Sequence, residues 1–182
     1  MAIVKRNFYN KNTIQVAKGI LGCFLVRKYK GKIIKAIITE TEAYRGEHDL
    51  ASHASRGKTR RTEIMYGTPG HAYVYMVYGM YFMLNIVTEK EGFPAAVLIR
   101  GVCIVGNNNY CSLQLDGPGK LTKFLHIDKS LNGHDLTIGK KLWLECPKDK
   151  KRLKIIQSPR VGVDYARHCR KWKWNFQIAN FH

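Results

Sequence analysis

The sequence predicts an α+β protein in which a single domain, residues 1–182, is built on a curved, mainly antiparallel β-sheet with flanking helices and a protruding β-hairpin. Its 182 residues are enough for one hydrophobic core and too few for two full-size domains. Runs of β-branched and aromatic residues alternate with turn-forming residues, as in hairpins. No internal repeat or low-complexity tract divides the chain, which also favours one domain.

Two segments predict the flanking helices. Residues 12–22 have apolar side chains at helical spacing, with Asn12 able to cap the N-terminus and Gly22 able to end the helix. Residues 120–127 predict a second helix, whose N-terminus lies at the Gly117-Pro118-Gly119 turn.

Strands are predicted at residues 23–29, 32–44, 72–77, 80–88 and 95–102. Lys30-Gly31 and Tyr78-Gly79 are the turn signals of two hairpins, and the last three strands form an antiparallel meander. Between the hairpins, residues 47–62 are polar, basic and rich in Ser, Thr and Gly, so we expect a long loop there. Long ordered loops are often functional.

The charge balance indicates a polyanionic partner. The chain has 31 Lys and Arg against 13 Asp and Glu, a formal net charge of +18. Folding does not require this excess, which repels itself in a compact state, and nucleic acid is the most common partner of such a chain. Hydrophobic residues make up 45% and charged residues 24%, which excludes disordered, collagen-like and coiled-coil chains.

The five cysteines are odd in number, widely spaced and without a C-x-x-C pair. Neither a disulfide framework nor a zinc knuckle is indicated, and a reducing compartment is expected. The N-terminus lacks the apolar core of a secretory signal, and the most apolar stretch, residues 73–87, is too short to cross a bilayer. We expect an intracellular protein, in the cytoplasm and nucleoid or in a eukaryotic nucleus, with no membrane partner.

The strand at residues 32–44 carries the first candidate catalytic group. Apolar side chains at alternate positions up to Ile38 share one face, and the same parity continues into Glu40, Glu42 and Tyr44. A carboxylate at the end of an apolar face is partly desolvated, which suits a general base or acid. The alternative is an ordinary glutamate that turns to water at the edge of the sheet, since the other face of this strand is apolar too.

Four tyrosines, Tyr73, Tyr75, Tyr78 and Tyr81, fall within nine positions. Tyr73 and Tyr75 share a strand face, where aromatic side chains commonly pack a sheet. Tyr78 lies at the expected hairpin turn, where packing does not require a large aromatic side chain. In a basic protein, an aromatic on a projecting hairpin is a candidate wedge for insertion between stacked bases.

The 47–62 loop contains His48, Asp49 and His53, but their spacing matches no recognised metal-binding motif, and no metal is expected.

Five basic residues are candidates for contact with DNA phosphates: Arg56, Lys58, Arg60 and Arg61 in the loop, and Lys120. Lys120 lies in the segment from Gly117 to Thr122, which looks like a nucleotide phosphate loop. The segment fails as one, because Gln114 stands in place of the first glycine and Leu121 in place of the Ser or Thr. The free backbone N–H groups at this helix start would still suit a phosphate. A solvated, functionally neutral loop face is the alternative for the basic cluster.

Several longer motifs occur in one order along the chain. They are Glu40-Thr41-Glu42-Ala43-Tyr44, Ala51-Ser52-His53, Pro69 to Tyr75 followed by Tyr78-Gly79-Met80-Tyr81 and Asn85, Val97 to Arg100, Gly117 to Thr122, and Pro159 to Val163. Together they resemble the 3-methyladenine DNA glycosylase family of the alkyladenine, or methylpurine, type. The resemblance spans most of the chain, and several motifs in register are far more specific than any one of them.

The resemblance implies hydrolysis of the N-glycosidic bond of alkylated and deaminated purines in duplex DNA, without a metal or an organic cofactor. It implies that Glu42 is the general base that activates water and that Arg100 lies beside that water. Glu40 does not match the family's catalytic position, so a structural role is expected for it.

The same resemblance implies a base-binding pocket. Tyr44, His53 and Tyr75 would sandwich the flipped base, and Asn85 would screen against the exocyclic amino group of guanine. Tyr78 would fill the gap that the base leaves in the duplex.

The chain departs from the family pattern in three places. Glu47 stands where the family usually has Pro, Thr62 where it usually has Asn, and residues 102–106 replace a Glu-Pro pair. These departures bear on loop conformation, DNA affinity and lesion range.

We expect a monofunctional monomer that acts on double-stranded DNA. The main alternative is a non-catalytic nucleic-acid-binding module. A metal-dependent nuclease is disfavoured, because the chain offers a poor set of metal ligands.

Overall fold

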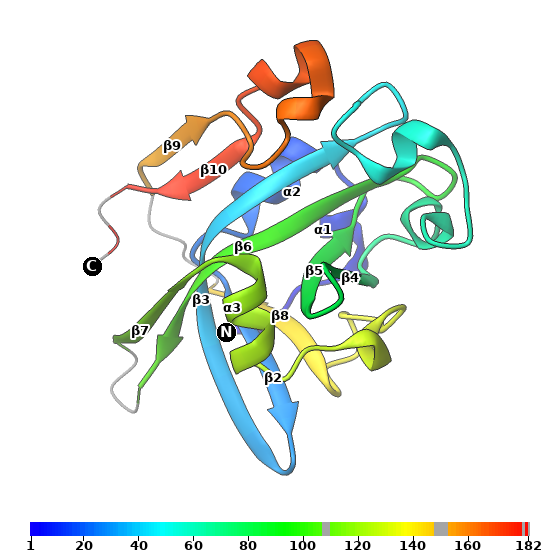
Figure 1. Ribbon diagram of the computed structural model, residues 1–182. Coiled ribbons are helices and arrows are strands. Elements are labelled where there is room, and N and C mark those ends of the chain that lie inside the picture. Colours follow the sequence, from blue (N-terminus) through cyan, green and yellow to red (C-terminus); the bar gives the residue numbers. More distant parts are fainter. Residues whose placement is uncertain (107–109, 148–152, 180, 182) are drawn as a thin grey trace.

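The computed structural model of the chain describes residues 1–106, 110–147, 153–179 and 181, in which ten strands form one sheet (Figure 1). The strands are β1 (Ala2–Ile3), β2 (Phe24–Tyr29), β3 (Lys32–Arg45), β4 (Ala72–Val77), β5 (Tyr81–Val87), β6 (Ala95–Val105), β7 (Cys111–Asp116), β8 (Leu142–Cys146), β9 (Ile155–Ser158) and β10 (Asn175–Ile178). The main order is β1-β8-β2-β3-β6-β5-β4; β7 pairs with β6, and β10 joins β9 to β3. All pairings between these strands are antiparallel, which confirms the predicted α+β fold class.

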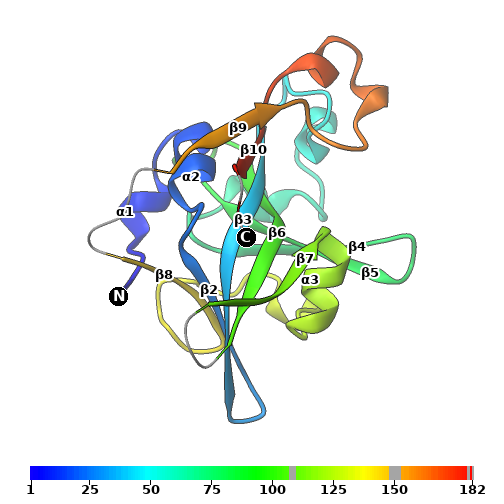
Figure 2. The ribbon, with the colours of Figure 1, turned by 90° about the vertical axis from the view of Figure 1, so that its left-hand side faces the viewer.

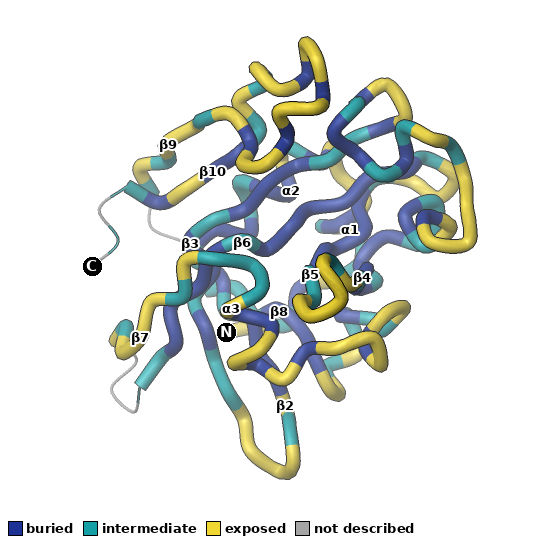
Figure 3. The backbone as a smooth tube through the Cα atoms, in the orientation of Figure 1, coloured by how far each residue is buried: buried dark blue, intermediate teal, exposed yellow. Residues whose placement is uncertain are grey.

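The helices are short and flank the sheet. They are α1 (Arg6–Tyr9), α2 (Thr13–Gly19), α3 (Pro118–Phe124) and the 3₁₀ helices η1 (His53–Arg56), η2 (Glu63–Tyr66), η3 (Lys129–Leu131) and η4 (Asp164–Lys171). Figure 2 shows α2 and α3 on opposite sides of β3 and β6. Val16 and Ala17 of α2 and Leu121 of α3 are fully buried in the main core. Burial is concentrated along β6 and the second half of β3, whereas exposed residues gather at the hairpin tips and loops (Figure 3).

β3 is the central strand of the sheet. Its first half pairs with β2 and its second half with β10, while β6 runs along its other edge. The β3–β6 ladder is irregular where Glu40 meets Gly101. A Cβ atom at Gly101 would lie 3.0 Å from the Cβ of Glu40, so glycine permits the close approach of the two strands at this point.

The predicted helices are present with shifted ends. The first begins at Thr13, with the Oδ1 of Asn12 accepting a hydrogen bond from the Ile14 N–H, and it ends at Gly19 instead of Gly22. The second begins at Pro118, because proline has no N–H to satisfy in the first turn, and it ends at Phe124.

The predicted strands and both hairpins are also present, and β6 continues to Val105 beyond its predicted end. The loop at residues 47–62 is interrupted by η1. No helix among the described residues is long and apolar enough to cross a membrane.

The expectation that the cysteines form no disulfides is wrong. Cys23 is bonded to Cys146, and Cys103 is bonded to Cys111. The first bond joins the residue before β2 to β8, and the second joins β6 to β7. The spacing of cysteines along the sequence does not reveal which strands are neighbours. Cys169 is free and buried. The expectation of a reducing compartment, which rested on unpaired cysteines, therefore loses its basis.

Candidate active site

The floor of a pocket is built from neighbouring rows of side chains on one face of the sheet. The register places Tyr73 of β4, Asn85 of β5, Leu98 of β6 and Glu42 of β3 opposite one another in turn. Residues that face each other in an antiparallel ladder project to the same side of the sheet. These four residues, the Glu42 row, therefore share one face.

Two adjacent rows follow from the same register, because every second residue of a strand projects to the same side. One row contains Tyr75, Met83 and Arg100, and the other contains Tyr44 and Ala96. The side chains of all three rows line the pocket, whose volume of about 370 Å³ is within the range of small-molecule sites.

Loops and helix ends form the walls of the pocket. The wall residues are Ala51, His53 of η1, Met65 of η2, Val77, Tyr78, Pro118 at the start of α3, and Val161, Gly162, Val163 and Tyr165. The last four follow β9, more than a hundred residues after Glu42, so the pocket exists only in the complete fold.

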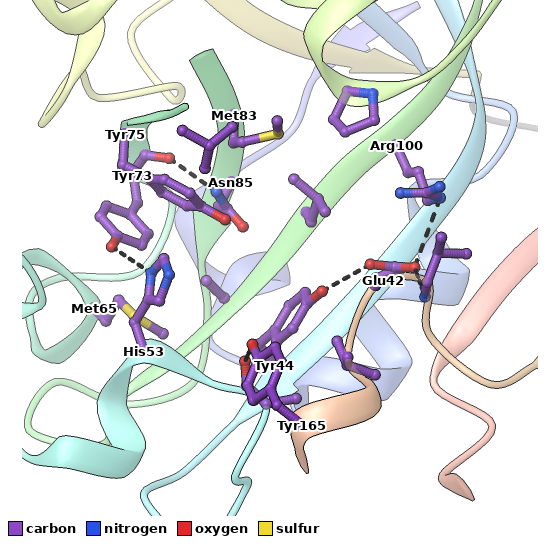
Figure 4. A pocket seen from close by; sticks show the side chains of 18 of the residues that line it. Glu42, Tyr44, His53, Met65, Tyr73, Tyr75, Met83, Asn85, Arg100 and Tyr165 are labelled. Carbon is purple, nitrogen blue, oxygen red and sulfur yellow. Dashed lines mark hydrogen bonds and ion pairs between the residues drawn. The ribbon is translucent and has the colours of Figure 1, made fainter. Parts of the chain in front are cut away.

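Glu42 is fully buried at the edge of the pocket, and both of its oxygens accept hydrogen bonds (Figure 4). The Tyr44 hydroxyl donates to Oε2 over 2.8 Å. The backbone N–H of Val161 and the side-chain Nδ2 of Asn175 donate to Oε1 over 2.9 and 3.1 Å. These donors offset the cost of burying a carboxylate, several kcal/mol for an ion, and they fix its orientation.

Arg100 connects Glu42 to a second carboxylate. Its Nε lies 3.0 Å from Oε1 of Glu40 and 3.7 Å from Oε1 of Glu42. Because Arg100 reaches both acids and Tyr44 bonds to Glu42, these residues share one side of β3, as the parity of the strand predicts. Thr41 points to the other side, where its hydroxyl donates to a backbone carbonyl of α2. Glu40 is not among the residues that line the pocket.

The opposite side of the pocket is an aromatic cluster. The Nδ1 of His53 lies 3.0 Å from the Tyr73 hydroxyl, and its ring centre lies 4.6 Å from that of Tyr75. The Nδ2 of Asn85 donates to the backbone carbonyl of Tyr73 over 3.2 Å (Figure 4). Burial, together with the positive charges of two nearby arginines, lowers the pKa of His53 to about 4. The imidazole is therefore neutral at neutral pH.

Tyr44 is held between Glu42 and a buried ion pair. Burial and the Glu42 carboxylate raise the pKa of Tyr44 well above its usual value, so its hydroxyl stays protonated and donates. The guanidinium carbon of Arg160 lies 4.8 Å from the centre of the Tyr44 ring. The same guanidinium forms an ion pair with Asp49 over 2.6 Å, and both side chains are fully buried.

The loop residues considered for a metal thus have other partners: Asp49 binds Arg160 and His53 contacts Tyr73. Within the described part of the chain, no three His, Cys, Asp or Glu side chains are grouped as metal ligands.

Tyr78 projects from the tip of the β4–β5 hairpin and is 88% exposed. Tyr78 and Gly79 have φ angles of 51° and 67°. Positive φ at both central residues matches the right-handed twist of a hairpin, but a bulky side chain rarely adopts it. The backbone therefore holds an aromatic side chain in an unfavourable conformation at the mouth of the pocket.

The five candidate phosphate-binding residues, Arg56, Lys58, Arg60, Arg61 and Lys120, are exposed and lie outside the pocket. Arg61 contacts a lining residue of the pocket, with its guanidinium carbon 5.0 Å from the centre of the Tyr75 ring. Lys120 forms an exposed ion pair with Asp116 over 2.8 Å. Their contact with DNA stays a prediction.

Two of the family departures stabilise the basic loop. Glu47 accepts a hydrogen bond from the Tyr66 hydroxyl over 2.6 Å. Thr62 is buried, and its hydroxyl donates to the Gly57 carbonyl over 3.1 Å.

The structure brings together all seven residues that the sequence places in the pocket: Glu42, Tyr44, His53, Tyr75, Tyr78, Asn85 and Arg100. Their individual roles stay predictions. Sequence reasoning missed other lining residues: Met65, Met83 and Tyr165 carry no recognisable pattern, and Val161 lies in a matching motif whose position in space was unknown.

The fold and the site define a class of protein: a strongly basic α+β protein whose antiparallel sheet carries an aromatic pocket beside a buried, hydrogen-bonded carboxylate. The chain belongs to the methylpurine-DNA glycosylase family, since the sequence pattern of the family described as Methylpurine-DNA glycosylase (MPG) matches residues 7–181.

Curated relatives agree with this membership. A protein of Methanocella arvoryzae is 45% identical, over 99% of this chain and 94% of its own length. A protein of Desulfitobacterium hafniense is 43% identical, over 96% and 94%. A protein of Legionella pneumophila strain Corby is 41% identical, over 100% and 94%. Each is provisionally named a 3-methyladenine DNA glycosylase.

Proposed function

We propose that the chain is a base-excision-repair glycosylase. It takes an alkylated purine of the 3-methyladenine type, or a deaminated purine, out of duplex DNA and hydrolyses its N-glycosidic bond. The observation that carries this proposal is Glu42, a fully buried carboxylate held on both oxygens at the edge of an aromatic pocket. A module that only binds DNA has no use for such a group, since a carboxylate facing a polyanion weakens binding.

Recognition of the base uses the aromatic lining. The flipped base lies among Tyr44, His53 and Tyr75, where a cationic alkylated purine gains about 0.5 to 2 kcal/mol from an aromatic face. Asn85 is fixed by its donation to the Tyr73 carbonyl over 3.2 Å, so it can clash with the exocyclic amino group of guanine. Flipping costs a few kcal/mol, least at a damaged pair, and Tyr78 offsets part of this cost by filling the gap in the duplex.

The chemical step needs one proton acceptor. The oxygen of a water bonds to the sugar C1′ while the C1′–N bond breaks, and the electron pair of that bond leaves with the base. Glu42 accepts the proton of the water, and Arg100 lies beside the reaction. A base alkylated on a ring nitrogen is cationic and departs as a neutral molecule, so no second carboxylate is required as general acid, in contrast to ordinary glycoside hydrolases. A deaminated purine carries no such charge, so the base that departs with the electron pair takes up a proton from solvent water. The products are the free base and an abasic site.

The proposal includes a monofunctional mechanism without a metal or an organic cofactor. No lysine is among the described residues that line the pocket, so water is the nucleophile in place of an amine. One chain supplies the pocket, so we propose that a monomer acts on double-stranded DNA. We also propose that it works where the DNA of the cell lies, in the cytoplasm and nucleoid or in the nucleus of a eukaryote.

The first experiment compares the wild-type chain with Glu42→Gln on methylated duplex DNA and on an inosine-containing duplex, with and without a chelator. We expect free base from the wild type in both chelator conditions, and a rate at least about a thousandfold lower for Glu42→Gln, because the amide cannot accept the proton of the water. Binding of lesion DNA should stay within a few-fold of wild type. Released base is measured by chromatography, and borohydride should trap no protein–DNA adduct.

Three results would contradict the proposal in different ways. Wild-type turnover by Glu42→Gln would show that Glu42 is not the general base. Tight, salt-sensitive binding without any base release would favour the non-catalytic module. Strand cleavage that the chelator abolishes would favour a metal-dependent nuclease.

A further inference from the structure

The Glu42 row continues past the pocket onto β10 and β9. Asn175 of β10 lies directly opposite Glu42, and Ser158 of β9 lies directly opposite Asn175. Glu40, two residues before Glu42 on β3, projects to the same side. Asn175 is 2% exposed and is not among the residues that line the pocket. It is therefore a buried polar side chain behind the carboxylate that the proposed reaction uses.

The amide of Asn175 joins the two carboxylates. Its Nδ2 donates to Oε1 of Glu40 over 2.7 Å and to Oε1 of Glu42 over 3.1 Å. On its other side, the Ser158 hydroxyl donates to Oδ1 over 3.3 Å. An ionised carboxylate only accepts hydrogen bonds, so the nitrogen of the amide must face the two glutamates. Both N–H groups of the amide are thereby used.

These contacts make the two oxygens of Glu42 unequal. Oε1 accepts from the Val161 N–H and from Asn175, whereas Oε2 accepts only from the Tyr44 hydroxyl. A carboxylate oxygen has about two lone-pair directions. Oε1 is therefore fully used, and Oε2 keeps one lone pair free.

We propose that Asn175 is a positioning residue for Glu42: its amide ties Oε1 to Glu40 and leaves Oε2 as the oxygen that accepts the proton of the attacking water. The inference rests on the proposed catalytic role of Glu42. Asn175 also reduces the repulsion between Glu40 and Glu42, because its amide donates to both. The positively charged Arg100, whose Nε lies near both acids, has the same effect. An aspartate at this position would offer no N–H and would bring a third carboxylate to the pair.

The test compares Asn175→Asp and Asn175→Ala with Gln157→Asp. Gln157 is an exposed residue of β9 that lies opposite Phe176, so its side chain projects to the other side of the sheet from Asn175. Gln157→Asp therefore adds the same charge close to β10 but away from both glutamates. Single-turnover excision from lesion DNA is measured between pH 5 and 9, together with the Kd for that DNA and the melting temperature of each variant.

We expect Asn175→Asp to excise at least a hundredfold more slowly at pH 7.5 and to move the acidic limb of the rate–pH profile to higher pH, because a third carboxylate favours protonation of the group. Asn175→Ala should excise about tenfold more slowly, since it leaves Glu42 with one donor fewer. For both variants the Kd should stay within threefold of wild type. Gln157→Asp should match wild type in rate and profile.

Two outcomes would overturn the inference. One is an excision rate and a pH profile for both Asn175 variants that equal those of wild type. The other is a rate loss that is the same at every pH and accompanied by weaker DNA binding, as general damage to the fold would give. In either case the loss of activity in Glu42→Gln still supports the proposed function, whereas a wild-type chain that releases no base contradicts the proposed function itself.

Discussion

Glu42 shows how much of this site depends on contacts between distant residues. Its hydrogen-bond donors come from the same strand, from the segment after β9 and from β10, at Tyr44, Val161 and Asn175. The parity of one strand correctly predicts that Glu40, Glu42 and Tyr44 share a side, because strand geometry is local. It cannot predict the other two donors, since their position depends on pairings between residues more than a hundred apart.

His53 should make the folded state sensitive to acid. Its pKa is lowered to about 4 in the folded state, against its usual value of 6.5. Between these values the unfolded chain binds more protons, so stability is full above about pH 6.5 and falls as the pH drops towards 4. We expect the free energy of unfolding to fall by about 1 to 2 kcal/mol more in wild type than in His53→Gln between pH 7.5 and 5, with allowance for partial exposure of the ring.

Urea denaturation at the two pH values measures this difference. His168→Gln, at an exposed histidine outside the pocket, is the control for removal of an imidazole. An equal loss of stability in wild type and His53→Gln would contradict the lowered pKa.

At the scale of elements, the strands of the hairpins could be predicted better than the helix ends. Alternation and turn residues locate β2 to β6 because a strand and its turn are specified within a few residues. The first helix ends at Gly19 although Gly22 is the stronger stop signal, so the context of the complete fold decides between two compatible ends. The irregular pairing of Glu40 with Gly101 could not be predicted from the sequence of β3 alone, because it arises where β3 and β6 approach each other closely.

The β4–β5 hairpin should act through its tip. We expect Tyr78→Ala to lower excision from duplex DNA about 10- to 100-fold, in line with roughly 1 to 3 kcal/mol for an aromatic–base contact. Simple electrostatic association with undamaged duplex should change little. Fluorescence of a flipped base analogue, measured beside the excision rate, separates capture of the flipped state from initial binding.

Tyr110→Ala is the matched control for the hairpin, because Tyr110 is 79% exposed and lies outside the pocket. It should behave as wild type in both assays. Equal losses for Tyr78→Ala on damaged and undamaged duplex would count against a role in filling the gap.

At the scale of the whole molecule, the net charge of +18 implies binding that depends strongly on salt. Replacing Lys58, Arg60 and Arg61 together by alanine should reduce the slope of log K against log salt concentration by about 2 to 3, close to one unit for each phosphate that is no longer neutralised. Binding titrations with undamaged duplex at several salt concentrations measure the slope.

A variant of equal charge shows whether the location of these residues matters. Lys28, Lys30 and Lys32 are exposed at the end of the β2–β3 hairpin, and their replacement by alanine removes the same three charges. The slope should then change by less than one unit. An unchanged slope in the Lys58, Arg60 and Arg61 variant would place the phosphate contacts outside the 47–62 loop.

The Glu42 row has a further consequence for how such a site can diversify. Neighbouring strands are held about 4.8 Å apart by their backbone hydrogen bonds, so the spacing from Glu42 across Leu98 to Asn85 cannot be adjusted without breaking the ladder. The positions of the wall residues are not fixed by strand pairing, because Met65 and Tyr165 belong to short helices between loops. Substitutions in these walls are therefore expected to change which ligands fit the pocket, while the sheet keeps the distance between Glu42 and Asn85 constant.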